Sequence, residues 1–101
     1  MPELPDLNPV VHGKIRLALL SLLAGVDEAE FTWLRGKTGS TDGNLGAHIE
    51  TLAKAGYVAV DKAFVGKKPQ TTVIATAAGR GAFARHVATL QGIIAASAKQ
   101  P

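Results

Sequence analysis

The chain has 101 residues, a formal net charge of +3 and no cysteine. This length fits one domain with a single core, and burial shared with a second copy would help to stabilise it. The lack of cysteine excludes a disulfide framework and a thiolate metal site. No stretch resembles a signal peptide or a membrane span, so we expect a cytoplasmic protein.

The N-terminal part predicts an arm followed by a long helix. Residues 1–7 contain two prolines and no helical period, so we expect a flexible arm. Asn8 followed by Pro9 is a helix-start signal, because asparagine caps free amides and proline tolerates the first helical position. The helix is expected over residues 9 to about 24. It carries two apolar stripes, and one of them is free to contact another element or another subunit.

The middle of the chain predicts two short helices joined by a turn. Residues 30–34 can supply a short edge strand, after which Thr32 caps a short helix that ends near residue 37. Ser40 or Thr41 caps the next helix, whose apolar residues recur at helical spacing before it ends at Gly56. Two helices joined by a short turn that contains glycine form a helix-turn-helix unit.

The remaining chain predicts a hairpin and a long last helix. Two strands with β-branched residues, at 57–64 and 70–76, flank a basic turn at 65–69. Thr76 caps a helix from 77 to about 97, and residues 98–101 should fray. The predicted fold is therefore α+β, mainly α. It is a winged helix-turn-helix over residues 8–97, with a three-helix core, a β-hairpin wing and a long C-terminal helix.

This order of elements predicts contact with double-stranded DNA. The second helix of such a unit lies in the major groove, so its outward residues must be polar or small. Asn44 could pair with adenine, and His48 could donate to a phosphate or a base edge. The expected contacts are Thr41, Asp42, Gly43, Asn44, Ala47, His48 and Thr51 on the recognition helix and Lys62, Lys67 and Lys68 on the wing. The alternative is that the helix face is only solvated and that the lysines protect an exposed β-edge.

Two glycines lie inside the predicted recognition helix. Gly43 and Gly46 each destabilise a helix by about 1 kcal/mol relative to alanine. This cost indicates that another backbone approaches them closely, and the candidates are DNA and the preceding helix.

Other kinds of site find little support. His12, His48 and His86 are too scattered for a metal-ligand spacing, and no catalytic constellation or cofactor motif is present, so we expect no enzyme.

A homodimer is expected, because an unpaired apolar face on a terminal helix would otherwise be an exposed patch. Its predicted interface comprises Val10, Leu17, Leu20, Phe83, Val87, Leu90 and Ile94.

The chain also resembles a known family. The resemblance lies in residues 8–17 (NPVVHGKIRL), 31–34 (FTWL), 41–52 (TDGNLGAHIETL), 55–58 (AGYV), 62–71 (KAFVGKKPQT) and 76–80 (TAAGR). Together they are similar to short single-domain winged-helix transcriptional regulators related to the MarR and ArsR groups, over about residues 7 to 90. The resemblance implies a homodimeric repressor or regulator whose recognition helix includes residues 41–48 and whose wing includes Lys67 and Lys68. Gly46 departs from the family, which often has a DNA-bonding serine there, and Asp42 and Glu50 make this helix less basic.

Two further classes stay open from the sequence. A winged helix can serve as a protein-interaction module, although the polar run at residues 41–51 argues against a buried face. A regulator can also sense a small-molecule effector in a pocket between the first and last helices. The sequence names neither the effector nor the operator.

Overall fold

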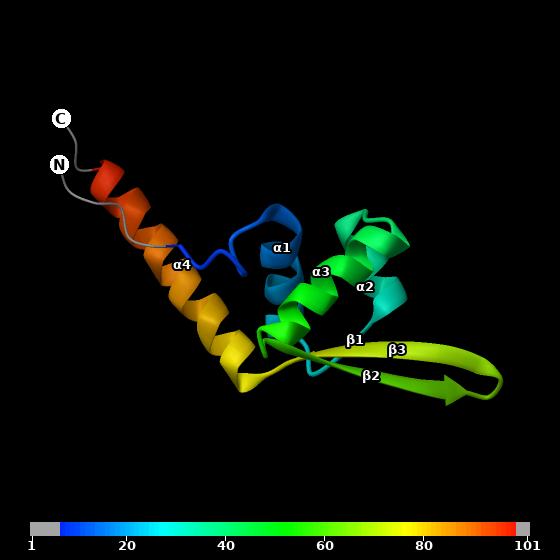
Figure 1. The fold of residues 1–101 in the computed structure, drawn as a ribbon. Coiled ribbons are helices and arrows are strands. Elements are labelled where there is room, and N and C mark those ends of the chain that lie inside the picture. Colours follow the sequence, from blue (N-terminus) through cyan, green and yellow to red (C-terminus); the bar gives the residue numbers. More distant parts are fainter. Residues whose placement is uncertain (1–6, 99–101) are drawn as a thin grey trace.

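The computed structural model describes residues 7–98, which form four helices and three strands (Figure 1). In chain order they are α1 (Lys14–Ala24), β1 (Ala29–Glu30), α2 (Phe31–Thr38), α3 (Asp42–Lys54), β2 (Val58–Val65), β3 (Lys68–Ala75) and α4 (Ala77–Ala98). This arrangement confirms the predicted α+β winged helix-turn-helix fold. The predicted arm falls outside the described residues except for Leu7, and the tail does so except for Ala98, which belongs to α4.

The core lies where the first three helices meet the base of the sheet. The strands are antiparallel in the order β1-β3-β2. Apolar side chains at helical spacing on α1 and α3 face inward together with residues from the strands and from α4. The buried core residues are Val11, Leu19, Leu20, Leu23, Ala29, Leu34, Leu45, Ile49, Leu52, Val58, Val73, Ala75 and Ala82.

The first helix begins five residues later than the sequence predicts. Asn8 does cap free amides, since its Oδ1 accepts from Val10 N at 2.9 Å and its carbonyl accepts from His12 N at 2.7 Å. This turn, at residues 8–12, is not continued, because Gly13 is extended with φ 174° and separates it from Lys14. Val10 therefore lies outside α1, which corrects the predicted double stripe.

The entry into the second helix also differs from the prediction. Thr32 lies inside α2, whose cap position is Glu30. Strand β1 pairs Ala29 with Val73 and Glu30 with Thr72, so the chain passes from the sheet directly into the helix. There is no free turn that Thr32 could cap. The Glu30 side chain instead accepts a hydrogen bond from Gln70 Nε2 at 2.6 Å.

The ends of α3 follow the predicted signals. Thr41 caps the start, because its hydroxyl accepts from Asn44 N at 3.2 Å. At the other end Gly56 has φ 80°, and the amides of Gly56 and Tyr57 donate to the carbonyls of Ala53 and Leu52. These two bonds form a Schellman motif, which needs a left-handed residue at the position of Gly56. The chain is thereby turned into β2.

The wing is a hairpin with a tighter tip than predicted. Val65 pairs with Lys68, so the turn consists of Gly66 and Lys67 alone. Gly66 has φ 65° and no other residue of the turn has a positive φ, as in a type II′ turn. Lys68 and Pro69 therefore belong to β3 rather than to the turn.

The start of α4 is tied to the end of α3. Thr76 N donates to Tyr57 O at 3.0 Å, and Thr76 Oγ1 donates to Gly56 O at 2.6 Å while accepting from Gly79 N at 3.0 Å. This confirms Thr76 as the cap. Gly79 packs directly on the Tyr57 carbonyl, and a Cβ at this position would overlap its oxygen.

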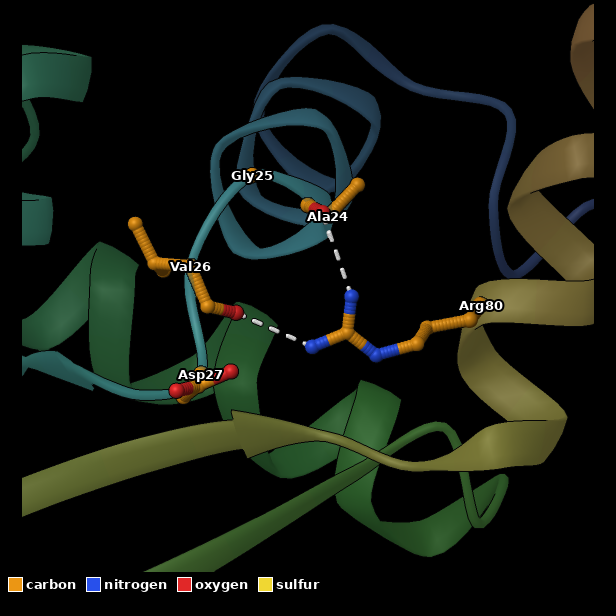
Figure 2. Close-up of a pocket in the computed structure, with 5 residues that line it drawn as sticks. All are labelled: Ala24, Gly25, Val26, Asp27 and Arg80. Carbon is orange, nitrogen blue, oxygen red and sulfur yellow. Dashed lines mark hydrogen bonds between the residues drawn. The ribbon is translucent and has the colours of Figure 1, made fainter.

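Arg80 fixes the direction of α4 relative to α1 (Figure 2). Its guanidinium donates to Ala24 O at 3.1 Å and to Val26 O at 2.9 Å. The last turn of α1 contains no basic residue, so Arg80 supplies the cation that the carbonyl end of a helix favours. From this anchor α4 and the wing extend away from the helical core in different directions, and the molecule measures 62 × 25 × 21 Å (Figure 1).

We expect Gly79→Ala to lower the free energy of unfolding by about 3 kcal/mol, because the added methyl group meets backbone that cannot move without breaking the strand junction. Urea unfolding measures the effect. The matched control is Gly92→Ala on the same helix, where no atom lies within 4 Å of the new Cβ. That change should stabilise the protein by about 0.5–1 kcal/mol. Equal stability of the two variants would contradict the packing argument.

Candidate nucleic-acid interface

The outer face of α3 is polar and accessible. Thr41, Asp42, Gly43, Asn44, Ala47 and Thr51 are all accessible to solvent, whereas Leu45, Ile49 and Leu52 on the opposite face are buried. His48 lies between these two faces. The structure therefore brings the predicted recognition-helix residues together on one surface, with His48 at its edge.

Several of these side chains are already engaged within the chain. Asp42 accepts from Arg35 Nη1 at 2.6 Å, so a cation from α2 offsets the acidic charge at the start of α3. Thr51 Oγ1 donates to Ala47 O at 3.1 Å, and the Thr41 hydroxyl is used in capping. Within residues 7–98 no hydrogen bond engages the side-chain amide of Asn44. This amide is thus available to a partner.

His48 is held by a residue of the first helix. Arg16 Nη1 lies 3.1 Å from His48 Nδ1. Arginine was not among the predicted site residues, and nothing in the sequence pattern links Arg16 to a position 32 residues away.

Neither helix glycine is crowded by another part of residues 7–98. A Cβ on Gly43 or on Gly46 would find no atom within 4 Å. The preceding helix therefore does not require a glycine at either position.

The wing carries its lysines on different faces. Partners across a hairpin point to the same side, so Lys62 lies on the face of Val58 and Val60, and Lys68 lies on the opposite face with Val65. Lys67 is in the turn, and all three are exposed. The predicted basic tip thus consists of Lys67 and Lys68, while Lys62 lies on the side of the wing that faces α3.

A groove separates α3 from this inner face of the wing. It has a volume of about 460 Å³ and is lined by Phe31, Gly46, Ile49, Glu50, Ala53, Val60, Lys62 and Thr71. Further along the same face Phe64 is 74% exposed, and Val65 on the other face is 62% exposed. The wing therefore combines cations with apolar side chains, which the sequence analysis did not single out.

The histidines are less scattered than the sequence suggests. His12 Nδ1 and His86 Nε2 lie 3.1 Å apart, so the turn at residues 8–12 contacts α4. His86 is buried and its Nδ1 has no hydrogen-bond partner among the described residues. Burial, and secondarily the proximity of His12, lower the pKa of His86 below 6.5. Among the described residues no group of three or more potential metal ligands comes together.

The predicted dimer residues divide into two sets. Leu20 is buried in the core, and Val10, Leu17 and Phe83 pack against that core. The prediction for Leu20 is therefore wrong, because its side chain leaves no surface for a partner. Val87, Leu90 and Ile94 lie on α4 outside the core, and Ile94 is 67% exposed.

A hollow lies at the C-terminal end of α1, beside Arg80 of α4 (Figure 2). It has a volume of about 590 Å³ and is lined by Ala24, Gly25, Val26, Asp27 and Arg80. Its walls are largely backbone and charged groups, and Arg80 is already bonded to two carbonyls there.

Across residues 7–98 no helix is long and apolar enough to cross a lipid bilayer.

Comparison with known proteins places the chain in a family with the same winged-helix fold. A family model described as a winged helix DNA-binding domain matches residues 15–94. An uncharacterized protein of Methanocaldococcus jannaschii is 32% identical over 78 residues, which span 77% of this chain and 85% of that protein. The chain belongs to the winged helix DNA-binding family.

Two solved structures resemble the winged-helix domain. A transcriptional regulator homologue from Pyrococcus horikoshii OT3 is 26% identical with a TM-score of 0.80, and the match covers 86% of each chain. The structure of NadR in complex with 4-hydroxyphenylacetate is 18% identical with a TM-score of 0.69, covering 87% of this chain and 64% of that one. This second likeness concerns the fold alone.

The stability of the winged-helix domain should decrease as the pH falls below about 6.5. The pKa of His86 is lower in the folded state than in the unfolded state, so the unfolded chain binds the proton first. Well above pH 6.5 both states hold His86 neutral, and the free energy of unfolding does not depend on this group. The free energy of unfolding then decreases progressively as the pH falls from 6.5 toward the folded-state pKa of His86. Urea unfolding at pH 7.5 and pH 5.0 measures the effect at a fixed protein concentration.

The control for this titration is His86→Leu, which fills the same buried position with a side chain that cannot bind a proton. Its free energy of unfolding should change less between the two pH values than that of the wild type. If both proteins are destabilised by the same amount, another group is responsible for the acid sensitivity.

Proposed function

We propose that this protein is a sequence-specific, double-stranded DNA-binding transcriptional regulator that acts as a homodimer. In this proposal α3 enters the major groove and the wing contacts the adjacent backbone or minor groove. The dimer binds a roughly palindromic operator, and its role as a repressor follows from the resemblance to the MarR and ArsR groups.

The observation that carries the proposal is the outer face of α3. It is exposed and includes Gly43 and the Asn44 amide, which no hydrogen bond engages within residues 7–98. Neither Gly43 nor Gly46, which lies at the groove beside the wing, relieves crowding among the described residues. Glycine in a helix is costly, so a partner that needs close backbone approach explains both positions better than solvent does. A phosphodiester backbone is such a partner, and the free amides at the start of a helix favour its negative charge.

Charge at the interface supports the same partner. Arg35 offsets the charge of Asp42, and Lys54 Nζ lies 3.1 Å from Glu50 Oε1. Both acids that make α3 less basic therefore have cations beside them. Lys67 and Lys68 then add cations at the wing tip. An interaction module that buries this helix against another protein would have to desolvate these charges.

The homodimer rests on the distal half of α4. This part of the helix extends beyond α1 (Figure 1), and it carries Leu90 and the largely exposed Ile94 outside the core. A chain of this length folded compactly has a radius of gyration of about 13 Å, whereas the value here is 15.8 Å. Pairing of two α4 helices would cover this protruding surface.

The wing and the recognition helix should differ in what they contribute. Replacing Lys67 and Lys68 with alanine should weaken cognate and scrambled duplexes about equally and reduce the slope of log affinity against log salt by about 1 for each phosphate that is no longer neutralised. Asn44→Ala should cost about 1–3 kcal/mol on the cognate duplex and much less on the scrambled one. Titration of both duplexes at two salt concentrations measures this. Equal effects of Asn44→Ala on the two duplexes would remove α3 as the element that recognises the sequence.

Leu90→Glu should convert the dimer into a monomer that keeps its helical content, because a carboxylate placed in an apolar interface is not compensated. Sedimentation equilibrium at micromolar concentration measures the mass. The matched control is the neighbouring Gln91→Glu, which adds the same charge at an exposed position and should leave the dimer intact. A wild-type protein that sediments as a monomer would contradict the dimer.

A further inference from the structure

Arg16 joins three segments of the molecule through one guanidinium. Its Nε donates to Val10 O at 2.6 Å and its Nη2 donates to Pro9 O at 3.2 Å. The remaining Nη1 lies 3.1 Å from His48 Nδ1 on α3. Two carbonyls of the turn at residues 8–12 therefore orient the planar guanidinium, and its third contact is with the recognition helix.

The turn that orients Arg16 is itself anchored at two points. Asn8 Nδ2 donates to the Tyr57 hydroxyl at 2.9 Å, and His12 contacts His86 on α4 at 3.1 Å. Val11 in the same turn is completely buried. The guanidinium is thus held in place by contacts that do not involve α3, so it can orient His48 rather than follow it.

The contact determines which nitrogen of His48 carries the proton. A guanidinium has only N–H donors and accepts no hydrogen bond. Nδ1 of His48 must therefore be the acceptor, and the neutral imidazole carries its proton on Nε2. The second nitrogen is then an N–H donor.

We propose that Arg16 is a positioning residue for DNA recognition that holds His48 as the Nε2–H tautomer. His48 follows Asn44 by one helical turn, so both side chains lie along the same stripe of α3. The acceptors that such a donor suits are guanine N7 and O6, adenine N7, thymine O4 and a phosphate oxygen. This inference rests on the proposed function, because it assigns a role to one side chain of the same interface.

The first experiment needs no DNA. Nitrogen-15 spectra of the imidazole side chains at neutral pH distinguish a protonated Nε2 from a protonated Nδ1, and the signals that disappear in His48→Gln belong to His48. Wild type should show a protonated Nε2 and a bare Nδ1. Arg16→Met removes the donor but keeps an apolar stem, and it should shift the His48 signals toward a mixture of tautomers. A protonated Nδ1 in neutral wild-type His48 would overturn the proposal, even if Arg16→Met does not fold.

The second experiment tests whether Arg16 acts through His48. On a cognate duplex Arg16→Met and His48→Ala should each lower the affinity by about three- to tenfold, the range expected for one hydrogen bond. The double variant should bind no more weakly than His48→Ala alone. Arg16→Lys keeps a donor, and His48→Gln keeps an N–H group near the position of Nε2, so each should recover part of the affinity.

Other outcomes separate the alternatives. In one outcome the losses of affinity caused by Arg16→Met and His48→Ala add in the double variant, and the slope of log affinity against log salt decreases. Arg16 then contacts a phosphate by itself, and the positioning role is wrong. If His48→Ala weakens cognate and scrambled duplexes equally, its partner is a phosphate rather than a base edge. If the wild type binds no duplex, the proposed function fails, while the tautomer experiment still tests the contact between Arg16 and His48.

Discussion

The carbonyl group of Tyr57 lies where the recognition helix, the wing and the last helix meet. It accepts from Thr76 N, and Gly79 packs against it without a side chain between them. The preceding residue, Gly56, ends α3 in a left-handed conformation and gives its own carbonyl to the Thr76 hydroxyl. The end of α3, the base of the hairpin and the start of α4 are therefore fixed relative to one another by a few backbone groups.

Around this junction, polar side chains add direction to the apolar contacts that Val11 and Ala82 make with the core. Arg80 bonds to the carbonyl end of α1 and so orients α4, and Arg16 bonds to the turn at residues 8–12 and reaches α3. Both arginines bind carbonyls with a fork of donors, which is directional in a way that packing of small apolar residues is not. Helices rich in alanine and glycine pack closely but have few large side chains to fix their angle. The guanidinium groups supply that direction.

The charges near α3 and the wing are arranged differently on the two elements. The acids of α3 are accompanied by Arg35 and Lys54, and the lysines of the wing tip remain unpaired within the part of the chain that the structure describes. Lys62 and Lys68 lie on opposite faces of the hairpin, so the cations surround the wing rather than form one patch. The cations of the wing and the uncrowded glycines Gly43 and Gly46 therefore belong to two different elements.

The sequence by itself determined the elements whose signals are local. The cap at Thr76, the glycine that ends α3 and the change of period after Tyr57 each depend on residues within a few positions, so the pattern predicts them correctly. For α3 the pattern narrows the cap to Ser40 or Thr41, and the structure selects Thr41. The predicted start of α1 was wrong, because Gly13 interrupts a turn that Asn8 had correctly begun. The tertiary structure alone decided that Leu20 belongs to the core, that His12 meets His86 across 74 residues and that Arg16 meets His48 across 32. Periodicity identifies the apolar face of a helix, but it contains no information on which other segment covers that face or which polar groups meet there.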